Sequence, residues 1–114
     1  MEYNRGDIVL VNFNPQKKAT EIGKIRPAII ISDSELNEIL DLVSVVALTT
    51  NLIDDALPLR IRILKRGDLN RDSDAMVEQL RSVSKDRVGQ KVASLKDEEL
   101  RVVEQGIKVM LGLK

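Results

Sequence analysis

The chain of 114 residues balances 18 Lys and Arg against 18 Asp and Glu, and 43% of its residues are apolar. The zero net charge disfavours a protein that grips nucleic acid over a wide basic face, although a local basic patch remains compatible with it. The sequence holds no Cys and no His, so disulfides, thiolate nucleophiles and histidine acid–base chemistry are excluded, and catalysis would have to use carboxylates, hydroxyls, Lys or Arg.

Length and hydropathy predict the general class of the protein. A chain of this length is expected to form one domain over residues 1–114. No apolar run approaches the length of a membrane span, and the first residues lack the pattern of a signal peptide. We therefore expect a cytoplasmic protein with no membrane partner.

The first third of the chain predicts two strands joined by a long polar loop. Residues 7–13 are rich in β-branched side chains and too short for a helix, and residues 28–31 are apolar at every position, as in a strand covered on both faces. Loops as long as residues 14–25 are often functional in compact domains, although a surface loop without function has the same composition. Ser32 and Glu35 fit a capping box that would open a helix of one or two turns.

The middle of the chain predicts further strands separated by charged loops. A third strand over residues 42–48 stops at Thr49, and after a loop over residues 51–58 the residues 59–64 alternate, with Arg60 and Arg62 on a face expected to meet water. A loop over residues 65–74 precedes a strand over residues 75–80, which Glu78 interrupts. Such an acid either faces water or is held by a cation.

The last third predicts a turn over residues 84–87, a small strand over residues 88–93 and one long helix that opens at residues 94–97. An apolar stripe on that helix would cover a sheet, and its members are Leu100, Val103, Ile107, Met110 and Leu111. Strands mostly without intervening helices predict a mainly β protein with α additions, a strongly bent antiparallel sheet or small barrel.

The candidate site centres on the junction where the loop 14–25 becomes a rigid strand. Pro27 fixes its own φ and pushes Arg26 into an extended conformation, which aims the guanidinium at a defined place. A solvated arginine at a loop end explains this stretch equally well. Two strand-end residues, Arg26 and Thr49, and two carboxylates, Glu21 and Glu78, could nevertheless converge at one rim of the sheet.

Such a cluster can cleave RNA without histidine or a metal. The substrate supplies its own nucleophile in the 2′-hydroxyl, so the protein need only remove a proton, stabilise the charge that builds on phosphorus and help the leaving oxygen depart. An arginine suits the second task because its planar fork matches two phosphate oxygens and stays charged.

Four ordered blocks run along nearly the whole chain. They are Arg5-Gly6-Asp7-Ile8-Val9 with Pro15, Glu21-x-Gly23-x-x-Arg26-Pro27, Val45-Val46-Ala47-Leu48-Thr49-Thr50, and Glu78-Gln79-Leu80-Arg81-Ser82-Val83-Ser84-Lys85. Through these blocks the chain resembles the MazF/PemK/Kid toxins of bacterial toxin–antitoxin pairs, which are sequence-specific messenger-RNA endoribonucleases.

The resemblance implies an SH3-like barrel (MazF/CcdB-like) with a short helix and a C-terminal helix, which works as a homodimer with single-stranded RNA in the interface groove. It also implies cleavage without cofactor or metal, leaving a 2′,3′-cyclic phosphate and a 5′-hydroxyl, and a cognate antitoxin as partner. We expect a disordered acidic antitoxin segment to meet Lys17, Lys18, Lys24 and Arg26.

The resemblance also assigns residues. Arg26 matches the catalytic arginine, Thr49 the threonine that helps hold the scissile phosphate, Glu21 lies in the loop that shapes the active site, and Glu78 matches an acid that serves as general base in some members. The residues expected to contact RNA are Lys17, Lys18, Gly23, Lys24, Thr50, Leu57, Pro58 and Gln79.

Departures from the pattern leave alternatives open. Met76 stands where some members carry a further arginine, which would shift charge stabilisation onto Arg26. A gyrase-directed toxin on the same fold relies on a C-terminal Trp-Gly-Ile, whereas this chain has no Trp. A non-catalytic binding module on the same barrel is the other alternative. With two aromatic residues in all, Tyr3 and Phe13, RNA recognition is expected to rely on hydrogen bonds in the loops more than on stacking.

Overall fold

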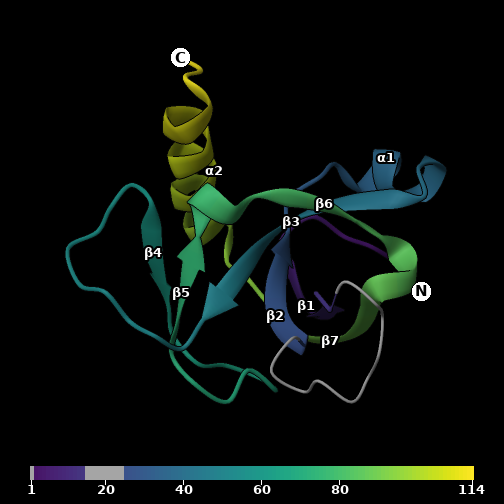
Figure 1. Ribbon diagram of the computed structural model, residues 1–114, viewed down its shortest axis with the longest axis horizontal. Helices are drawn as coiled ribbons and strands as arrows, with labels where there is room; N and C mark the ends of the chain where they lie inside the picture. The colour runs from purple at the N-terminus through teal and green to yellow at the C-terminus, as the bar shows by residue number, and fades with distance from the viewer. Residues whose placement is uncertain (1, 15–24) are drawn as a thin grey trace.

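The computed structural model describes residues 2–14 and 25–114, which are organised around an antiparallel sheet (Figure 1). Strands follow one another across this sheet in the order β4 (Arg60–Ile63), β5 (Ser73–Met76), β3 (Leu42–Thr49), β2 (Ile25–Ile30), β1 (Asp7–Asn12) and β7 (Val88–Ser94). A further strand, β6 (Arg81–Ser84), also pairs with β3. The mainly β class, with a short helix and a C-terminal helix, is confirmed.

The central strands β1, β2 and β3 bury both of their faces, as their unbroken apolar runs predict. On one face Ile8, Ile29 and Val46 belong to a cluster that also includes Val103 of the C-terminal helix. On the other face a second cluster joins side chains of β1, β2, β3 and β6, with Phe13 packed at its margin. The ends of β2 and β3 are therefore anchored by two cores, which holds any side chain that projects there in place.

The short helix α1 (Ser34–Ile39) begins one residue later than predicted. Asp33 is its N-cap, and the Asp33 carboxylate accepts hydrogen bonds from the backbone N–H groups of Glu35 (3.0 Å) and Leu36 (3.1 Å). The predicted cap, Ser32, instead accepts a hydrogen bond from the backbone N–H of Ser44 at 3.0 Å. Ser32 is engaged in this way because the chain beside it still pairs with β3.

The predicted strand over residues 75–80 is wrong in its second half. Strand β5 begins two residues earlier, within the predicted loop, and after Met76 the chain forms a 3₁₀ turn, η2 (Val77–Gln79). The backbone N–H of Val77 donates to the carbonyl of Leu59 at 3.1 Å, which turns the chain away from β4. This turn delivers β6, which no sequence pattern indicated, to the first half of β3.

The predicted turn at residues 84–87 is a second 3₁₀ turn, η3 (Lys85–Arg87), and the small strand after it is β7. The C-terminal helix α2 (Asp97–Leu111) begins at Asp97, with the backbone N–H of Lys96 bonded to the Glu99 carboxylate at 2.8 Å. Leu111, predicted on the buried stripe, is 52% exposed, because it lies in the last turn beyond the sheet. Within the described residues, no helix has the length and apolar character needed to cross a membrane.

The contact between α2 and the connection before β4 is made at Gly106. A Cβ at this position would lie 2.4 Å from the carbonyl oxygen of Pro58 and 3.3 Å from Val77 Cγ2. We therefore expect Gly106→Ala to lower the free energy of unfolding by about 1–3 kcal/mol, although alanine is the better helix former. Urea denaturation will measure the difference, with the exposed Gln105→Ala as control, and a Gly106→Ala variant as stable as the wild type would show that α2 can shift freely.

Candidate functional site

The ends of β2 and β3 bring Arg26 and Thr49 together. The two strands are paired with Ala28 opposite Ala47 and Ile29 opposite Val46, so the same register sets Arg26 opposite Thr49. Both residues line one cavity of about 330 Å³, together with Thr50 and Asn51. The predicted meeting of the strand-end arginine and threonine is thus present in the structure.

A second cavity, of about 350 Å³, opens on another side of Arg26. It is lined by Phe13, Arg26, Ala47, Gln79 and Arg81, which come from β1's end, β2, β3, η2 and β6. The Arg81 guanidinium carbon lies 5.3 Å from the centroid of the Phe13 ring, a cation–π contact that orients it. Two arginines and an amide around one open cavity suit an anionic ligand that can accept several hydrogen bonds.

The polar side chains of this region are available to a ligand. Among the described residues, Arg26, Gln79 and Arg81 make no side-chain hydrogen bond or ion pair with another residue. Thr49 Oγ1 accepts a hydrogen bond from the backbone N–H of Asn51 at 3.1 Å, which leaves the hydroxyl hydrogen free to donate.

Glu78 lies on η2 and is held by a cation, one of the two arrangements that its place in an apolar run predicts. Its Oε1 accepts from Nε (2.8 Å) and Nη2 (2.6 Å) of Arg60. Glu78 does not line either cavity of Arg26. The ion pair places this carboxylate toward β4 and leaves its neighbour Gln79 beside Arg26.

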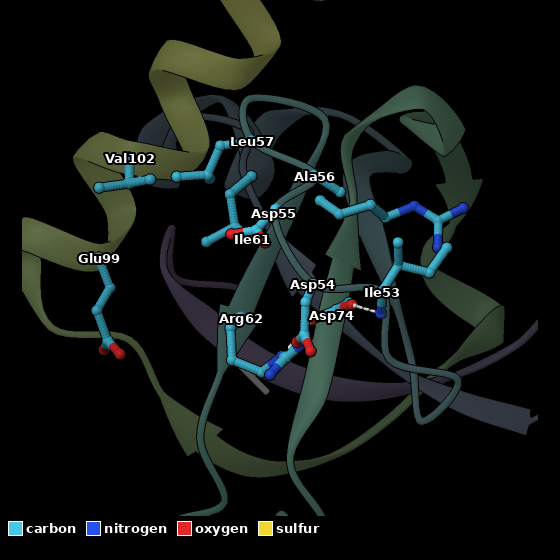
Figure 2. A pocket seen from close by; sticks show the side chains of 11 residues that line it. Ile53, Asp54, Asp55, Ala56, Leu57, Ile61, Arg62, Asp74, Glu99 and Val102 are labelled. Carbon is cyan, nitrogen blue, oxygen red and sulfur yellow. Dashed lines mark hydrogen bonds and ion pairs between the residues drawn. The ribbon is translucent and has the colours of Figure 1, made fainter.

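The alternation predicted for β4 is confirmed, since Ile61 and Ile63 are buried and Arg62 is exposed, and the two arginines of the strand are in addition paired with carboxylates. Arg62 Nε donates to Asp74 Oδ1 at 2.6 Å, and Arg62 Nη2 donates to Asp54 Oδ1 at 2.8 Å. Asp74 is 1% exposed, and its Oδ2 accepts the backbone N–H of Ile53 at 2.7 Å. Figure 2 shows Arg62 pointing toward Asp54 and Asp74, so this side of β4 is a network that fixes the loop over residues 51–58.

The network shifts the pKa values of its members. Burial raises the pKa of the Asp74 carboxyl, but the hydrogen bonds from Arg62 and from the Ile53 N–H lower that pKa more, so the net pKa is below its usual range. The hydrogen bonds to Asp74 and Asp54 raise the pKa of Arg62. Asp74 therefore stays ionised, as a structural carboxylate should.

A further cavity, of about 620 Å³, lies between this loop, β4 and α2, and Leu57 lines it rather than a cavity of Arg26 (Figure 2). Its lining holds the four carboxylates of Asp54, Asp55, Asp74 and Glu99 and the two guanidinium groups of Arg60 and Arg62, so acidic groups outnumber cations around it. The structure thus brings Thr50 and Gln79 to Arg26 and places Leu57 apart from them. Pro58 lies at the exit of the same loop, with its carbonyl against α2.

The remaining predicted residues, Lys17, Lys18, Glu21, Gly23 and Lys24, lie outside the described residues. Sequence reasoning missed Phe13 and Arg81 as site residues. The signal for Arg81 was present in the block that begins at Glu78, and the signal for Phe13 was its position as a lone aromatic at the end of a strand. Within residues 2–14 and 25–114 no group of three or more acidic side chains is arranged to hold a metal ion.

Comparison with known proteins identifies the family of this chain. Residues 4–111 match the family model described as the PemK-like, MazF-like toxin of type II toxin–antitoxin systems. The endoribonuclease MazF of Staphylococcus saprophyticus is 33% identical over 110 residues, which cover 96% of this chain and 91% of that protein. The chain belongs to the PemK-like, MazF-like family of type II toxins and is a homologue of endoribonuclease MazF.

Solved structures show the same fold. MazF from Deinococcus radiodurans superposes with a TM-score of 0.79 at 22% identity and covers 99% of each chain. A mycobacterial endoribonuclease in complex with its cognate antitoxin superposes with a TM-score of 0.78 at 17% identity, over 98% of this chain and 97% of that one. These likenesses define a MazF-like fold.

Proposed function

We propose that this protein is a toxin that cleaves single-stranded messenger RNA at specific sequences, without a metal or cofactor, and so inhibits translation and growth. The main support is the meeting of Arg26 and Thr49 at facing strand ends, beside Gln79 and Arg81, whose side chains form no hydrogen bond with another described residue. Family membership and the homology to an endoribonuclease support the same conclusion. As messenger RNA is the substrate, the proposed site of action is the cytoplasm.

In the proposed reaction the 2′-hydroxyl oxygen attacks the adjacent phosphorus and the bond to the 5′-oxygen breaks, which gives a 2′,3′-cyclic phosphate. The departing 5′-oxygen takes a proton from water and becomes a 5′-hydroxyl. The fork of Arg26 binds the two non-bridging oxygens as their charge increases. The Thr49 hydroxyl donates a further hydrogen bond to the phosphate. A carboxylate removes the 2′-hydroxyl proton, and because Glu78 is already paired with Arg60, Glu21 is the favoured base.

The proposed assembly is a homodimer whose interface groove holds the RNA, with a cognate antitoxin that covers the same groove. Two of the similar solved structures are complexes with a second protein, namely the mycobacterial endoribonuclease with its cognate antitoxin and MazE–MazF from Deinococcus radiodurans. We propose that RNA or an acidic antitoxin segment contacts the loop residues Lys17, Lys18, Gly23 and Lys24. RNA is also proposed to contact Thr50, Leu57 and Pro58.

A long unstructured RNA incubated with the purified protein in excess EDTA tests the nuclease. Product ends are mapped by sequencing, and their chemistry follows from labelling: 5′-hydroxyl ends accept phosphate from polynucleotide kinase directly, whereas cyclic phosphates resist phosphatase. We expect cleavage at one short recurring sequence with these ends. Intact RNA in the presence of folded, dimeric protein would overturn the nuclease and favour a binding module.

Arg81 is proposed to supply a second cation at the phosphate. Met76, which stands where some family members carry a further arginine, has no charge and cannot fill this role. Arg81→Ala is expected to lower the single-turnover cleavage rate about ten- to a hundredfold, because one charge-assisted interaction is lost. Arg81→Lys should recover part of the rate, since the charge remains but the fork is lost. The exposed helix residue Arg101 gives the matched control, Arg101→Ala, and equal rates for Arg81→Ala and Arg101→Ala would remove Arg81 from the site.

A further inference from the structure

A fourth cavity, of about 350 Å³, adjoins the site and has no role in the proposed reaction. It shares the lining residues Pro27, Leu48 and Thr50 with the cavity of Arg26 and Thr49, so the two cavities are neighbours at the ends of β2 and β3. In Figure 1 the connection from β4 to β5 lies at this same end of the sheet, below β2. A strand of RNA with a phosphate at Arg26 would therefore have a neighbouring group within reach of this cavity.

The connection between β4 and β5 forms one wall of this cavity. Hydrogen bonds hold this connection in a defined conformation. The backbones of Arg66 and Leu69 exchange hydrogen bonds of 3.1 and 2.8 Å, and the N–H of Asp68 donates to the carbonyl of Val92 in β7 at 2.8 Å. Gly67 has φ +53°, and a Cβ there would lie 2.9 Å from the Val92 carbonyl oxygen. Leu69 is 4% exposed, which anchors the loop in the core and presents the next residues to the cavity in a fixed position.

The cavity combines an apolar floor with a polar rim. Leu10, Leu48, Leu69 and Val92 supply aliphatic surface, of which the last three are buried. The rim carries the side chains of Asp68, Asn70, Arg71, Ser73 and Gln90. Asn70, Arg71 and Gln90 are exposed and form no side-chain hydrogen bond with any other described residue, so their donors and acceptors remain open to a ligand.

We propose that this cavity binds one unstacked nucleobase of the RNA strand, next to the phosphate held by Arg26 and Thr49, and that it sets the base required at that position. The inference rests on the proposed function. A flat base can pack on the aliphatic floor, and the amides of Asn70 and Gln90 each offer one donor and one acceptor, the pair that a base edge presents. Asp68 on the rim repels a phosphate, whereas Arg71 can pair with the phosphate that follows the base.

The test compares Asn70→Ala/Gln90→Ala with the wild type on a pool of RNA randomised around the cleaved bond. The preference at each position is the ratio of cleavage frequencies for the four bases. We expect the double variant to lose about tenfold or more of the preference at one position beside the cleaved bond, because good paired hydrogen bonds to a base edge are lost. Preferences at the other positions should stay as they are. Gln105→Ala, an exposed amide on α2, is the matched control.

A second arm separates failure of this inference from failure of the proposed nuclease. The same pool is selected for binding to the Arg26→Ala protein with and without the Asn70 and Gln90 substitutions, which needs no cleavage. If the base preference in binding disappears when Asn70 and Gln90 are replaced, the result supports base binding in this cavity, even if the wild type leaves RNA intact. Unchanged preferences, or an equal loss of cleavage at all sequences, would overturn it.

Discussion

Arg26→Ala is expected to reduce RNA cleavage at least a hundredfold while the protein stays folded. Removal of one preorganised donor at a developing oxyanion typically costs about 10²–10³ in rate, and Arg26 is proposed to supply two. The side chain is exposed and makes no hydrogen bond with another described residue, so its loss removes no structural contact. Single-turnover cleavage of a short RNA gives the rate, and thermal unfolding shows that the fold is retained.

Two further variants distinguish a catalytic arginine from a general positive charge. Arg26→Lys should remain well below the wild type, because an ammonium group cannot present two parallel donors to two phosphate oxygens. Arg101→Ala removes one exposed arginine from α2 and should cleave at the wild-type rate. If Arg26→Ala and Arg101→Ala both cleave as the wild type does, Arg26 has no part in the chemistry.

The strands of the central sheet could be predicted from the sequence because a continuous apolar run indicates a strand that is buried on both faces. The run over residues 28–31 is apolar throughout, since β2 is covered by a core on each face. By contrast, the break between β5 and β6 depends on a long-range bond, from the Val77 N–H to the Leu59 carbonyl. A periodic pattern carries no sign of such a bond, so the residues 75–80 looked like one strand.

The candidate site, too, could be predicted from the sequence only in part. Arg26 and Thr49 could be predicted because a local motif places each at the end of a strand, and antiparallel pairing of neighbouring strands then sets them opposite each other. Arg81 reaches Arg26 only because β6 pairs with β3, with Arg81 opposite Val45. The wall of the fourth cavity, which the connection between β4 and β5 forms, depends on a contact between Asp68 and β7. Those positions follow from strand order, which residue patterns do not specify.

Asp74→Ala is expected to lower the free energy of unfolding by roughly 2–4 kcal/mol, because it removes a buried carboxylate that accepts two hydrogen bonds. The variant would leave the Ile53 N–H without its acceptor and would deprive Arg62 of its buried partner. Asp74 also pairs with Thr49 across β5 and β3, so the end of the site strand should loosen. Urea denaturation measures the stability, and Asp41→Ala, at an exposed carboxylate, is the control.

Asp74→Asn separates the charge of this carboxylate from its shape. The amide oxygen can still accept the Ile53 N–H, whereas the ion pair with Arg62 is lost, so the expected stability lies between those of Asp74→Ala and the wild type. A variant with asparagine as stable as the wild type would show that the charge contributes nothing and that an uncharged acceptor for the Ile53 N–H is sufficient.

The same carboxylate predicts how stability depends on pH. The pKa of Asp74 is lower in the folded protein than its value of about 3.9 in an unfolded chain, so its contribution is fully present above that value and is lost as pH falls toward the folded pKa. The pKa of Glu99 is also lowered, by its hydrogen bonds with Arg66, so part of the acid dependence belongs to that pair. Urea denaturation from pH 6 to pH 3 should therefore show a shallower loss of stability for Asp74→Asn than for the wild type, and a slope that does not change would assign the whole dependence to other carboxylates.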